Sequence, residues 1–197
     1  MGKIFCLMGK SASGKDTVFK KILERKNILL TTVVPGTTRP IREGERDGIE
    51  YFYYTHEEFL ELEKAGKIIE YRQYNTVHGI WTYFTADDGQ IDLTQSNYIL
   101  IGTLEAYIAL RNHFGQENVV PLYIDLDDGE RLQRALSRER KENVPKYAEM
   151  CRRFLADQED FSAEKLVAAG EITTFYNEEV EQTVTEIESY MINLLEK

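Results

Sequence analysis

A glycine-containing segment near the start of the chain constrains the fold more than any other feature of the sequence. Residues 9–17 read Gly-Lys-Ser-Ala-Ser-Gly-Lys-Asp-Thr, which fits the phosphate-binding pattern G-x-x-x-x-G-K except that Asp16 stands where Ser or Thr is usual. The apolar run Lys3–Met8 precedes it, and an amphipathic segment from about Lys15 to Arg25 follows. Glycines let the backbone curl around a phosphate, and the helix that begins there adds the positive end of its dipole. The segment predicts a strand, a phosphate-binding loop and a helix, as at the beginning of an α/β nucleotide-binding fold.

The loop residues have separate expected tasks. Lys15 is expected to reach the β- and γ-phosphates of ATP. Asp16 could supply a hard oxygen ligand to Mg²⁺, or it could only cap the helix while Thr17 or a water takes the metal. A chance glycine turn is the alternative, but the position between an apolar strand and an amphipathic helix argues against it. The predicted ATP site consists of Gly9, Ser11, Ala12, Ser13, Gly14, Lys15, Asp16 and Thr17.

Charge and composition argue against several classes of protein. The formal net charge is -10, and an acidic chain repels a phosphate backbone, so we expect no nucleic-acid partner. No apolar run approaches the length of a membrane span. The two cysteines, Cys6 and Cys151, lie far apart, which favours reduced thiols and a cytoplasmic location. The sequence does not decide between a monomer and a homodimer.

The distribution of strand and helix patterns divides the chain. After Gln95, apolar strands alternate with amphipathic helices down to a closing helix, which predicts a mainly parallel sheet with helices on both faces. The segment from about Thr31 to Asp88 is instead rich in Tyr, Thr and Gly, with short strands around one helix. We expect a core of residues 1–33 and 89–197, an inserted mixed α/β lobe at 34–88, and a helical lid at about 137–150.

Two arginines in this lobe are candidates for binding an anion. Arg39 and Arg42 are three residues apart and are flanked by Pro40 and Gly44, so they can approach one phosphate from two sides. Tyr51 offers a hydroxyl group to the same anion. Alone, the segment is better explained as a solvated charged loop.

Taken with the phosphate loop, this region resembles the guanylate kinase family. That family has the pattern T-T-R-x-x-R-x-G-E followed by G-x-x-Y, then a helix that carries phenylalanine and a segment ending in I-I-E. The chain has these elements in the same order over nearly its whole length, and the last of them ends at Glu70. The resemblance implies a P-loop NTPase core and an acceptor-binding lobe. It implies that Arg39, Arg42 and Tyr51 hold the acceptor phosphate and that Glu70 accepts hydrogen bonds from guanine.

Besides Asp16, three further positions depart from the family pattern. His78 lies where the family has a tyrosine, and it is either a ligand-facing substitute or a surface residue. Ile101 and Thr103 occupy the places of two aspartates, of which the second reads guanine and the first lies near the phosphates and metal. We keep Thr103 in the predicted acceptor site, and we hypothesise that Asp16 compensates for the missing metal-side charge.

A basic segment follows in the second half of the chain. Residues 131–153 contain eight basic and only three acidic side chains in an otherwise acidic protein, which is typical of an anion-binding surface. A helix face with Glu–Arg pairs is the alternative reading. Pro145 divides the segment into two arms, as a lid requires. By family position, Arg138 and Arg153 are expected to contact the transferring phosphoryl group, with Arg134 and Arg140 as weaker candidates.

The sequence therefore predicts a phosphotransferase that uses ATP and Mg²⁺ and acts on a small nucleotide. We expect in-line transfer to a nucleoside monophosphate, GMP or dGMP, with Lys15, Arg138 and Arg153 as catalytic residues. Two alternatives stay open at this point. One is the same fold acting on another nucleoside monophosphate or a ribosyl bisphosphate, and the other is a non-catalytic binding module, which the retained loop glycines and Lys15 oppose.

Overall fold

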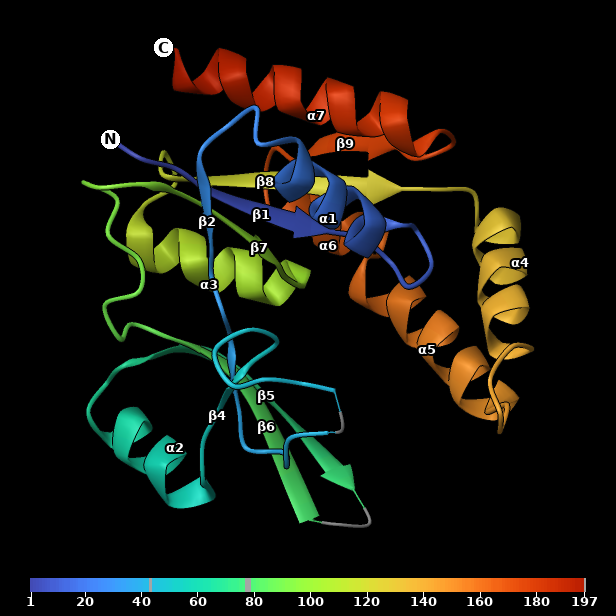
Figure 1. The fold of residues 1–197 in the computed structure, drawn as a ribbon, viewed down its shortest axis with the longest axis horizontal. Coiled ribbons are helices and arrows are strands. Elements are labelled where there is room, and N and C mark those ends of the chain that lie inside the picture. Colours follow the sequence, from blue (N-terminus) through green and yellow to red (C-terminus); the bar gives the residue numbers. More distant parts are fainter. Residues whose placement is uncertain (43, 77–78, 197) are drawn as a thin grey trace.

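Five parallel strands form the centre of the molecule, in the order β2-β7-β1-β8-β9 (Figure 1). The structure is a computed structural model and describes residues 1–42, 44–76 and 79–196. The central strand β1 lies between β7 and β8, so its side chains are buried on both faces. In sheet order, the strands are β2 (Leu30–Thr32), β7 (Asn97–Ile101), β1 (Ile4–Met8), β8 (Val119–Asp125) and β9 (Thr173–Tyr176).

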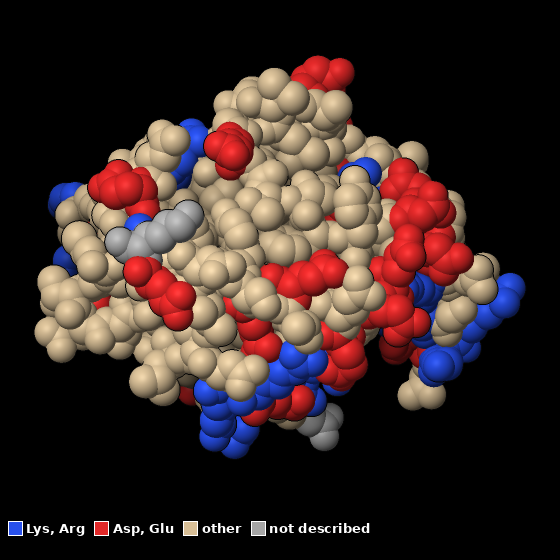
Figure 2. Space-filling view, turned by 90° about the horizontal axis from the view of Figure 1, so that it is seen from above, with Lys and Arg blue, Asp and Glu red and all other residues tan. Residues whose placement is uncertain are grey.

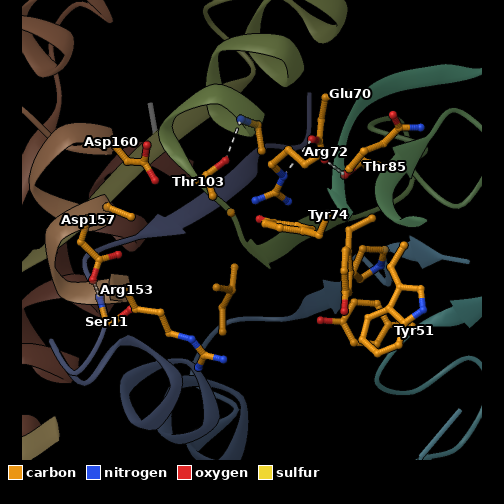
Figure 3. Close-up of a pocket in the computed structure, with 18 of the residues that line it drawn as sticks. Ser11, Tyr51, Glu70, Arg72, Tyr74, Thr85, Thr103, Arg153, Asp157 and Asp160 are labelled. Carbon is orange, nitrogen blue, oxygen red and sulfur yellow. Dashed lines mark hydrogen bonds and ion pairs between the residues drawn. The ribbon is translucent and has the colours of Figure 1, made fainter. Parts of the chain in front are cut away.

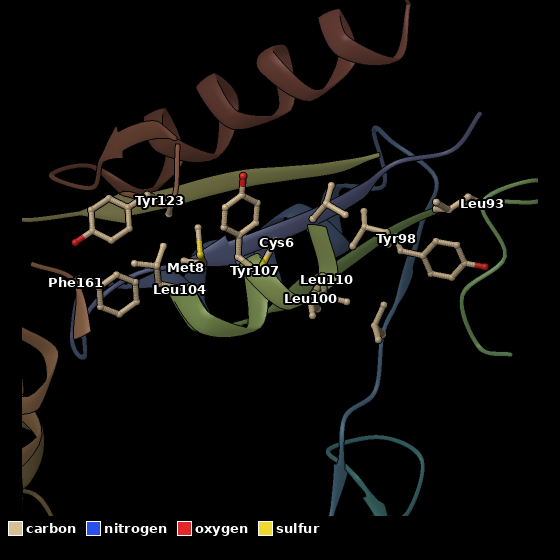
Figure 4. Packing of buried hydrophobic residues seen from close by; sticks show 14 residues of the cluster. Cys6, Met8, Leu93, Tyr98, Leu100, Leu104, Tyr107, Leu110, Tyr123 and Phe161 are labelled. Carbon is tan, nitrogen blue, oxygen red and sulfur yellow. The ribbon is translucent and has the colours of Figure 1, made fainter. Parts of the chain in front are cut away.

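Helices cover both faces of this sheet (Figure 1). Ile4, Cys6 and Met8 of β1 belong to one core cluster with α3, shown in Figure 4, whereas Phe5 and Leu7 belong to a second cluster with α1 and α7. Successive side chains of a strand point to opposite faces, so this one strand supplies the centre of both clusters. The helices of this part are α1 (Lys15–Arg25), α3 (Leu104–Phe114), α4 (Asp128–Glu139), α5 (Tyr147–Asp160), α6 (Ala163–Ala168) and α7 (Val180–Leu195).

Ion pairs connect the first and last helices on the outside of the core. Arg25 of α1 donates a hydrogen bond to Glu188 of α7 over 3.0 Å, and both Arg25 and Lys21 pair with Glu181. Figure 2 views the molecule from above, and on this face acidic side chains are interspersed with basic ones. Within the described ranges, no helix has both the length and the apolar character needed to cross a membrane.

A second, mixed sheet lies beside the first, with the strand order β4-β3-β6-β5. Its strands are β4 (Phe52–Tyr53), β3 (Gly36–Thr37), β6 (Gly79–Ala86) and β5 (Ile68–Thr76), and α2 (His56–Lys64) packs against it (Figure 1). A capping box begins α2, because the Thr55 hydroxyl accepts from the Glu58 N–H and the Glu58 carboxylate accepts from the Thr55 N–H. Phe59 of α2 and Phe84 of β6 form the centre of a small separate core.

The α/β class and the parallel sheet are confirmed, and the helix predicted from about Lys15 to Arg25 is observed with those bounds. Sequence reasoning missed β2, β3, β6 and α6. Three of these elements have only two, three and six residues, too few to show a clear hydrophobic period. That residues 34–88 and 137–150 act as a separate lobe and lid stays a prediction.

Candidate active site

The phosphate loop joins the end of β1 to the beginning of α1, at the edge of the sheet where the parallel strands end. Gly14 has φ +90°, and a Cβ there would lie 2.2 Å from the Asn177 side-chain nitrogen, so this position requires glycine. Asn177 is buried and donates a hydrogen bond to the carbonyl of Ser13 over 2.7 Å. The loop is therefore held in its curled form by Asn177, which directly follows β9 and is far from the loop in the sequence.

Helices α4 and α5 hold the other side of the loop. The Ser11 N–H donates to the Asp157 carboxylate over 2.8 Å, and the Ser11 carbonyl accepts from the Arg131 Nε over 3.1 Å. Arg131 is fully buried and also pairs with Asp157 and Asp128. Arg131, the first basic residue of the segment 131–153, therefore has a structural role, since buried charges require partners.

Lys15 and Asp16 begin α1, directly after the loop. The Lys15 ammonium lies 3.4 Å from the Asp16 carboxylate, whose side chain is 78% exposed. Thr17 is exposed as well. Asp16 makes no capping hydrogen bond at this helix, where the cap residue is Gly14. A carboxylate at this place is available to a hard cation.

One cleft of about 990 Å³ connects the phosphate loop with the mixed sheet. Its walls include Ser11 from the loop, Glu70 and Tyr74 from β5, and Arg153 from α5 (Figure 3). Aromatic rings from the mixed sheet and its loops form much of one wall, namely Tyr51, Tyr74, Trp81 and Tyr83. Such a wall offers flat apolar area to a planar base, while the polar groups between the rings can fix its orientation.

The two arginines predicted to bind an acceptor phosphate differ in their surroundings. Arg42 lines the cleft, and its guanidinium lies 5.9 Å from the centre of the Trp81 ring. Arg39 is buried, forms two hydrogen bonds of 2.8 and 2.6 Å with Glu45, and does not line the cleft. Hydrogen bonding by Arg39 lowers the pKa of Glu45 to about 2.

Tyr51 lies between the buried Arg39 and the cleft. It lines the cleft and lies under the Arg39 guanidinium, 5.1 Å from ring centre to Cζ. Burial raises the pKa of its hydroxyl. The hydroxyl is therefore present as a neutral donor at neutral pH, as the predicted role toward a phosphate requires.

The predicted base-reading residues lie at the back of the cleft. The Glu70 carboxylate accepts a hydrogen bond from Thr85 over 2.9 Å, and its other oxygen lies 3.5 Å from the Arg72 Nε (Figure 3). Thr103 lines the cleft and also caps α3 by accepting from the Ala106 N–H. Ile101 lines the cleft too. His78 lies outside the described residues.

A second cavity of about 500 Å³ lies between the loop and the predicted lid. Arg138 lines it, and Ser11, Glu149 and Arg153 line both this cavity and the larger cleft. Arg153 therefore lies where the two spaces adjoin. Arg134 lines neither space and donates to the Asn177 carbonyl over 3.4 Å. Arg140 is exposed at the end of α4.

Glu149 organises the arginines at this junction. Its carboxylate accepts from Arg152 over 2.7 and 2.8 Å and from Arg153 over 2.9 Å. Hydrogen bonds from Arg152 and then Arg153 lower the pKa of Glu149 to about 2. Their spacing of three and four residues along a helix predicts such pairs, and the sequence reasoning noted Glu–Arg pairs without identifying these.

Several cleft residues were missed from the sequence, above all Arg72, Tyr74 and Asp157. Arg72 and Tyr74 follow Glu70 at intervals of two residues along β5, so the alternation of side chains along a strand places all three on one face. Asp157 is one of four acidic residues in the amphipathic helix α5, and nothing in the pattern distinguishes it from the others.

A phosphate loop that faces an acceptor cleft across the ends of parallel strands defines a P-loop phosphotransferase of the nucleoside monophosphate kinase class. The model of the family described as guanylate kinase matches residues 1–193 of the chain. The chain belongs to the guanylate kinase family.

Individual relatives agree with this result. The chain is 29% identical over 199 residues to the guanylate kinase of Anaplasma phagocytophilum, a match that covers 97% of this chain and 86% of that protein. It is 30% identical over 174 residues to that of Thermotoga maritima, covering 84% and 69%. A shorter match of 79 residues, 47% identical, covers 40% of this chain and 38% of the guanylate kinase of Oceanobacillus iheyensis. The crystal structure of the Anaplasma phagocytophilum enzyme superimposes with a TM-score of 0.62 at 25% identity, covering 98% of this chain and 85% of that one.

Proposed function

We propose that this protein transfers the γ-phosphoryl group of ATP to GMP or dGMP and releases ADP with GDP or dGDP. The observation that carries the proposal is the single cleft shared by Ser11 of the phosphate loop, Arg42 and Tyr51 on the acceptor side, and Glu70 at its back. The names of the relatives support the same activity. Phosphoryl transfer needs little covalent help from a protein, so positioning and charge neutralisation are the tasks of these side chains.

In this proposal the donor and the acceptor are held by different elements. The loop amides and Lys15 bind the β- and γ-phosphates of ATP, while Arg42 and Tyr51 bind the acceptor phosphate. Arg138 and Arg153 neutralise negative charge on the transferring group, since Arg153 lines both cavities. Closure of the lid excludes water, which would otherwise accept the phosphoryl group.

Mg²⁺ belongs to the proposal as well. Among the described residues no three His, Cys, Asp or Glu side chains gather into a metal site. Mg²⁺ in nucleotide sites is usually held by one or two carboxylates together with substrate phosphates, so the exposed Asp16 beside Lys15 fits it. Asp16 would hold the ion, which when bound neutralises phosphate charge. An Asp16→Ala variant with unchanged Mg²⁺-dependent activity would count against this role, whereas serine would supply the hydroxyl ligand that is usual at this position.

We also propose a cytoplasmic location. Cys6 is buried in the core and Cys151 is exposed, and both are free thiols. Free thiols are the usual state of cysteine in a reducing compartment, which supports this location.

One assay tests the activity. The protein is offered Mg²⁺–ATP with GMP, dGMP, AMP, UMP, CMP or ribose 1,5-bisphosphate, and ADP release is measured. We expect turnover with GMP and dGMP, and loss of that turnover in a folded Lys15→Ala variant. Turnover with the bisphosphate instead would replace the acceptor in the proposal. If none of the offered acceptors supports ADP release, the protein is a non-catalytic binding module.

A further inference from the structure

Arg72 is a charged residue of the acceptor cleft to which neither the family pattern nor the proposed mechanism assigns a role. It lies on β5 two residues after Glu70, so both side chains project from the same face of the mixed sheet. Their neighbours on β6 are Thr85 opposite Glu70 and Tyr83 opposite Arg72, and all four residues line the cleft. A cation and an anion thus stand side by side at the back of the cleft.

The way Arg72 approaches Glu70 leaves most of its donors unused. The shortest approach of its guanidinium to the carboxylate is from Nε, at 3.5 Å, which is too long for a strong hydrogen bond. This Nε is buried without a hydrogen-bond partner. In the part of the chain that the structure describes, the two terminal nitrogens form no hydrogen bond with protein, and Figure 3 shows them directed into the cleft near Tyr74. A purely structural ion pair would turn the fork of the guanidinium toward the carboxylate.

The pair presents acceptors and donors in adjacent positions. Glu70 has lone pairs beyond the one used by Thr85, so it can accept from N–H groups. Arg72 offers planar N–H donors beside it. Guanine has N–H donors at N1 and at its 2-amino group and a carbonyl acceptor at O6 on the same edge, whereas adenine has a donor at position 6 and an acceptor at N1. The pattern of the pair therefore complements guanine and opposes adenine.

We propose that Arg72 is a specificity-determining residue that donates a hydrogen bond to O6 of the acceptor's guanine, next to the N–H groups bound by Glu70. A carboxylate in the place of Thr103 would be a charged acceptor for guanine N–H groups, whereas the Thr103 hydroxyl is neutral and uses one of its two lone pairs to accept from Ala106. The Arg72 contact therefore supplies discrimination that this position provides only weakly. The cation also offsets the charge of the largely buried Glu70. The inference rests on the proposed function and assigns to the Arg72 guanidinium part of the selection of guanine in the acceptor.

The test compares GMP with 6-thioguanosine monophosphate, whose N1–H and 2-amino groups are unchanged but whose sulfur is a weak acceptor. Dissociation constants are measured by calorimetry without ATP, and kcat/KM is measured for both acceptors with Mg²⁺–ATP. In Arg72→Met we expect binding of GMP to weaken about tenfold or more and binding of the thio analogue to weaken less than about threefold, so that the preference for GMP falls.

Two further variants make the comparison specific. Arg46→Met removes an exposed arginine of the same lobe and is expected to leave both constants unchanged. Arg72→Lys keeps the positive charge beside Glu70 but not the planar fork, and it is expected to keep the thermal stability while losing part of the preference. Should Arg72→Met not fold, Arg72→Lys carries the same comparison.

Two results would overturn the inference: an unchanged preference for GMP in both Arg72 variants, or an equal weakening of both ligands. Equal weakening would mean that Arg72 acts only through Glu70. Failure of the proposed function is a different result, since the unchanged protein would then turn over neither GMP nor dGMP.

Discussion

The carboxylate of Asp157, on α5, accepts a hydrogen bond from the backbone N–H of Ser11 in the phosphate loop, with the two atoms 2.8 Å apart. The same carboxylate binds Arg131, which in turn donates to the Ser11 carbonyl. The backbone N–H and the backbone carbonyl of Ser11 are therefore both satisfied by side chains of α4 and α5. The shape of the loop and the position of α5 are physically coupled through these contacts.

Replacing Arg131 tests this coupling. Arg131→Met keeps much of the side-chain volume but leaves Asp128, Asp157 and the Ser11 carbonyl without their shared donor. We expect the free energy of unfolding, measured with urea, to fall by about 3 kcal/mol because a buried charge network loses its centre. The KM for ATP should rise more than the KM for GMP. Arg140→Met, at an exposed position of the same region, serves as the control for stability, and equal stability of the two variants would refute the expectation.

Substitutions of the two arginines of the T-T-R-x-x-R segment, Arg39 and Arg42, are expected to have different effects on stability and on the KM for GMP. Arg42 faces the cleft, so Arg42→Met should raise the KM for GMP about tenfold or more and leave the urea midpoint nearly unchanged. Arg39 is buried against Glu45, so Arg39→Met should lower the urea midpoint as well as the activity. A comparison of denaturation curves and KM values distinguishes the two. Identical effects of both substitutions would contradict the difference in their surroundings.

The core was predictable because its signals are local. The strand, loop and helix over residues 4–25 carry an apolar run, glycines and a helical period in direct succession, and the structure has each of them. The mixed sheet was less predictable, because β3 has two residues and is held by its partners β4 and β6 rather than by its own sequence. Strand pairing over such distances has no local signature.

The family motif brought together residues that also lie together in the structure. Arg42, Tyr51 and Glu70 line one cleft, and their binding of an acceptor stays a prediction. The pairing of Arg39 with Glu45 could not be predicted, because both belong to one charged loop whose conformation decides which group faces the ligand. Contacts between distant segments, such as that of Asp157 with the phosphate loop, depend on the tertiary packing of α5 and leave no trace in the pattern.

The two thiols should differ in reactivity. Cys6 lies in the core on β1, and burial raises its pKa to about 12, so it has little thiolate at neutral pH. Cys151 is exposed on α5. We expect iodoacetamide to modify Cys151 in the folded protein and Cys6 only after unfolding, as peptide mass spectrometry can show. Modification of Cys6 at a similar rate under native conditions would indicate that β1 opens readily.

The pairing of Glu45 with Arg39 predicts how stability depends on pH. The folded-state pKa of Glu45 is about 2, below its ordinary value of 4.5, because Arg39 and the Arg42 N–H hold its charged form. A carboxyl group with a lowered pKa stabilises the folded state fully above its ordinary pKa, and this contribution is lost as the pH falls toward the folded-state value. The relevant range is therefore about pH 4.5 down to 2.

Glu45→Gln removes this titration and leaves Arg39 buried against a neutral amide. Urea unfolding of both proteins is measured at several pH values from neutral to acidic. We expect the unchanged protein to be more stable at neutral pH and the difference between the two to shrink as the pH falls below 4.5. Other carboxyl groups with lowered pKa, such as Glu149, titrate in both proteins, so the difference isolates Glu45. A difference that stays constant down to the lowest pH would show that Arg39 does not stabilise the charged form of Glu45.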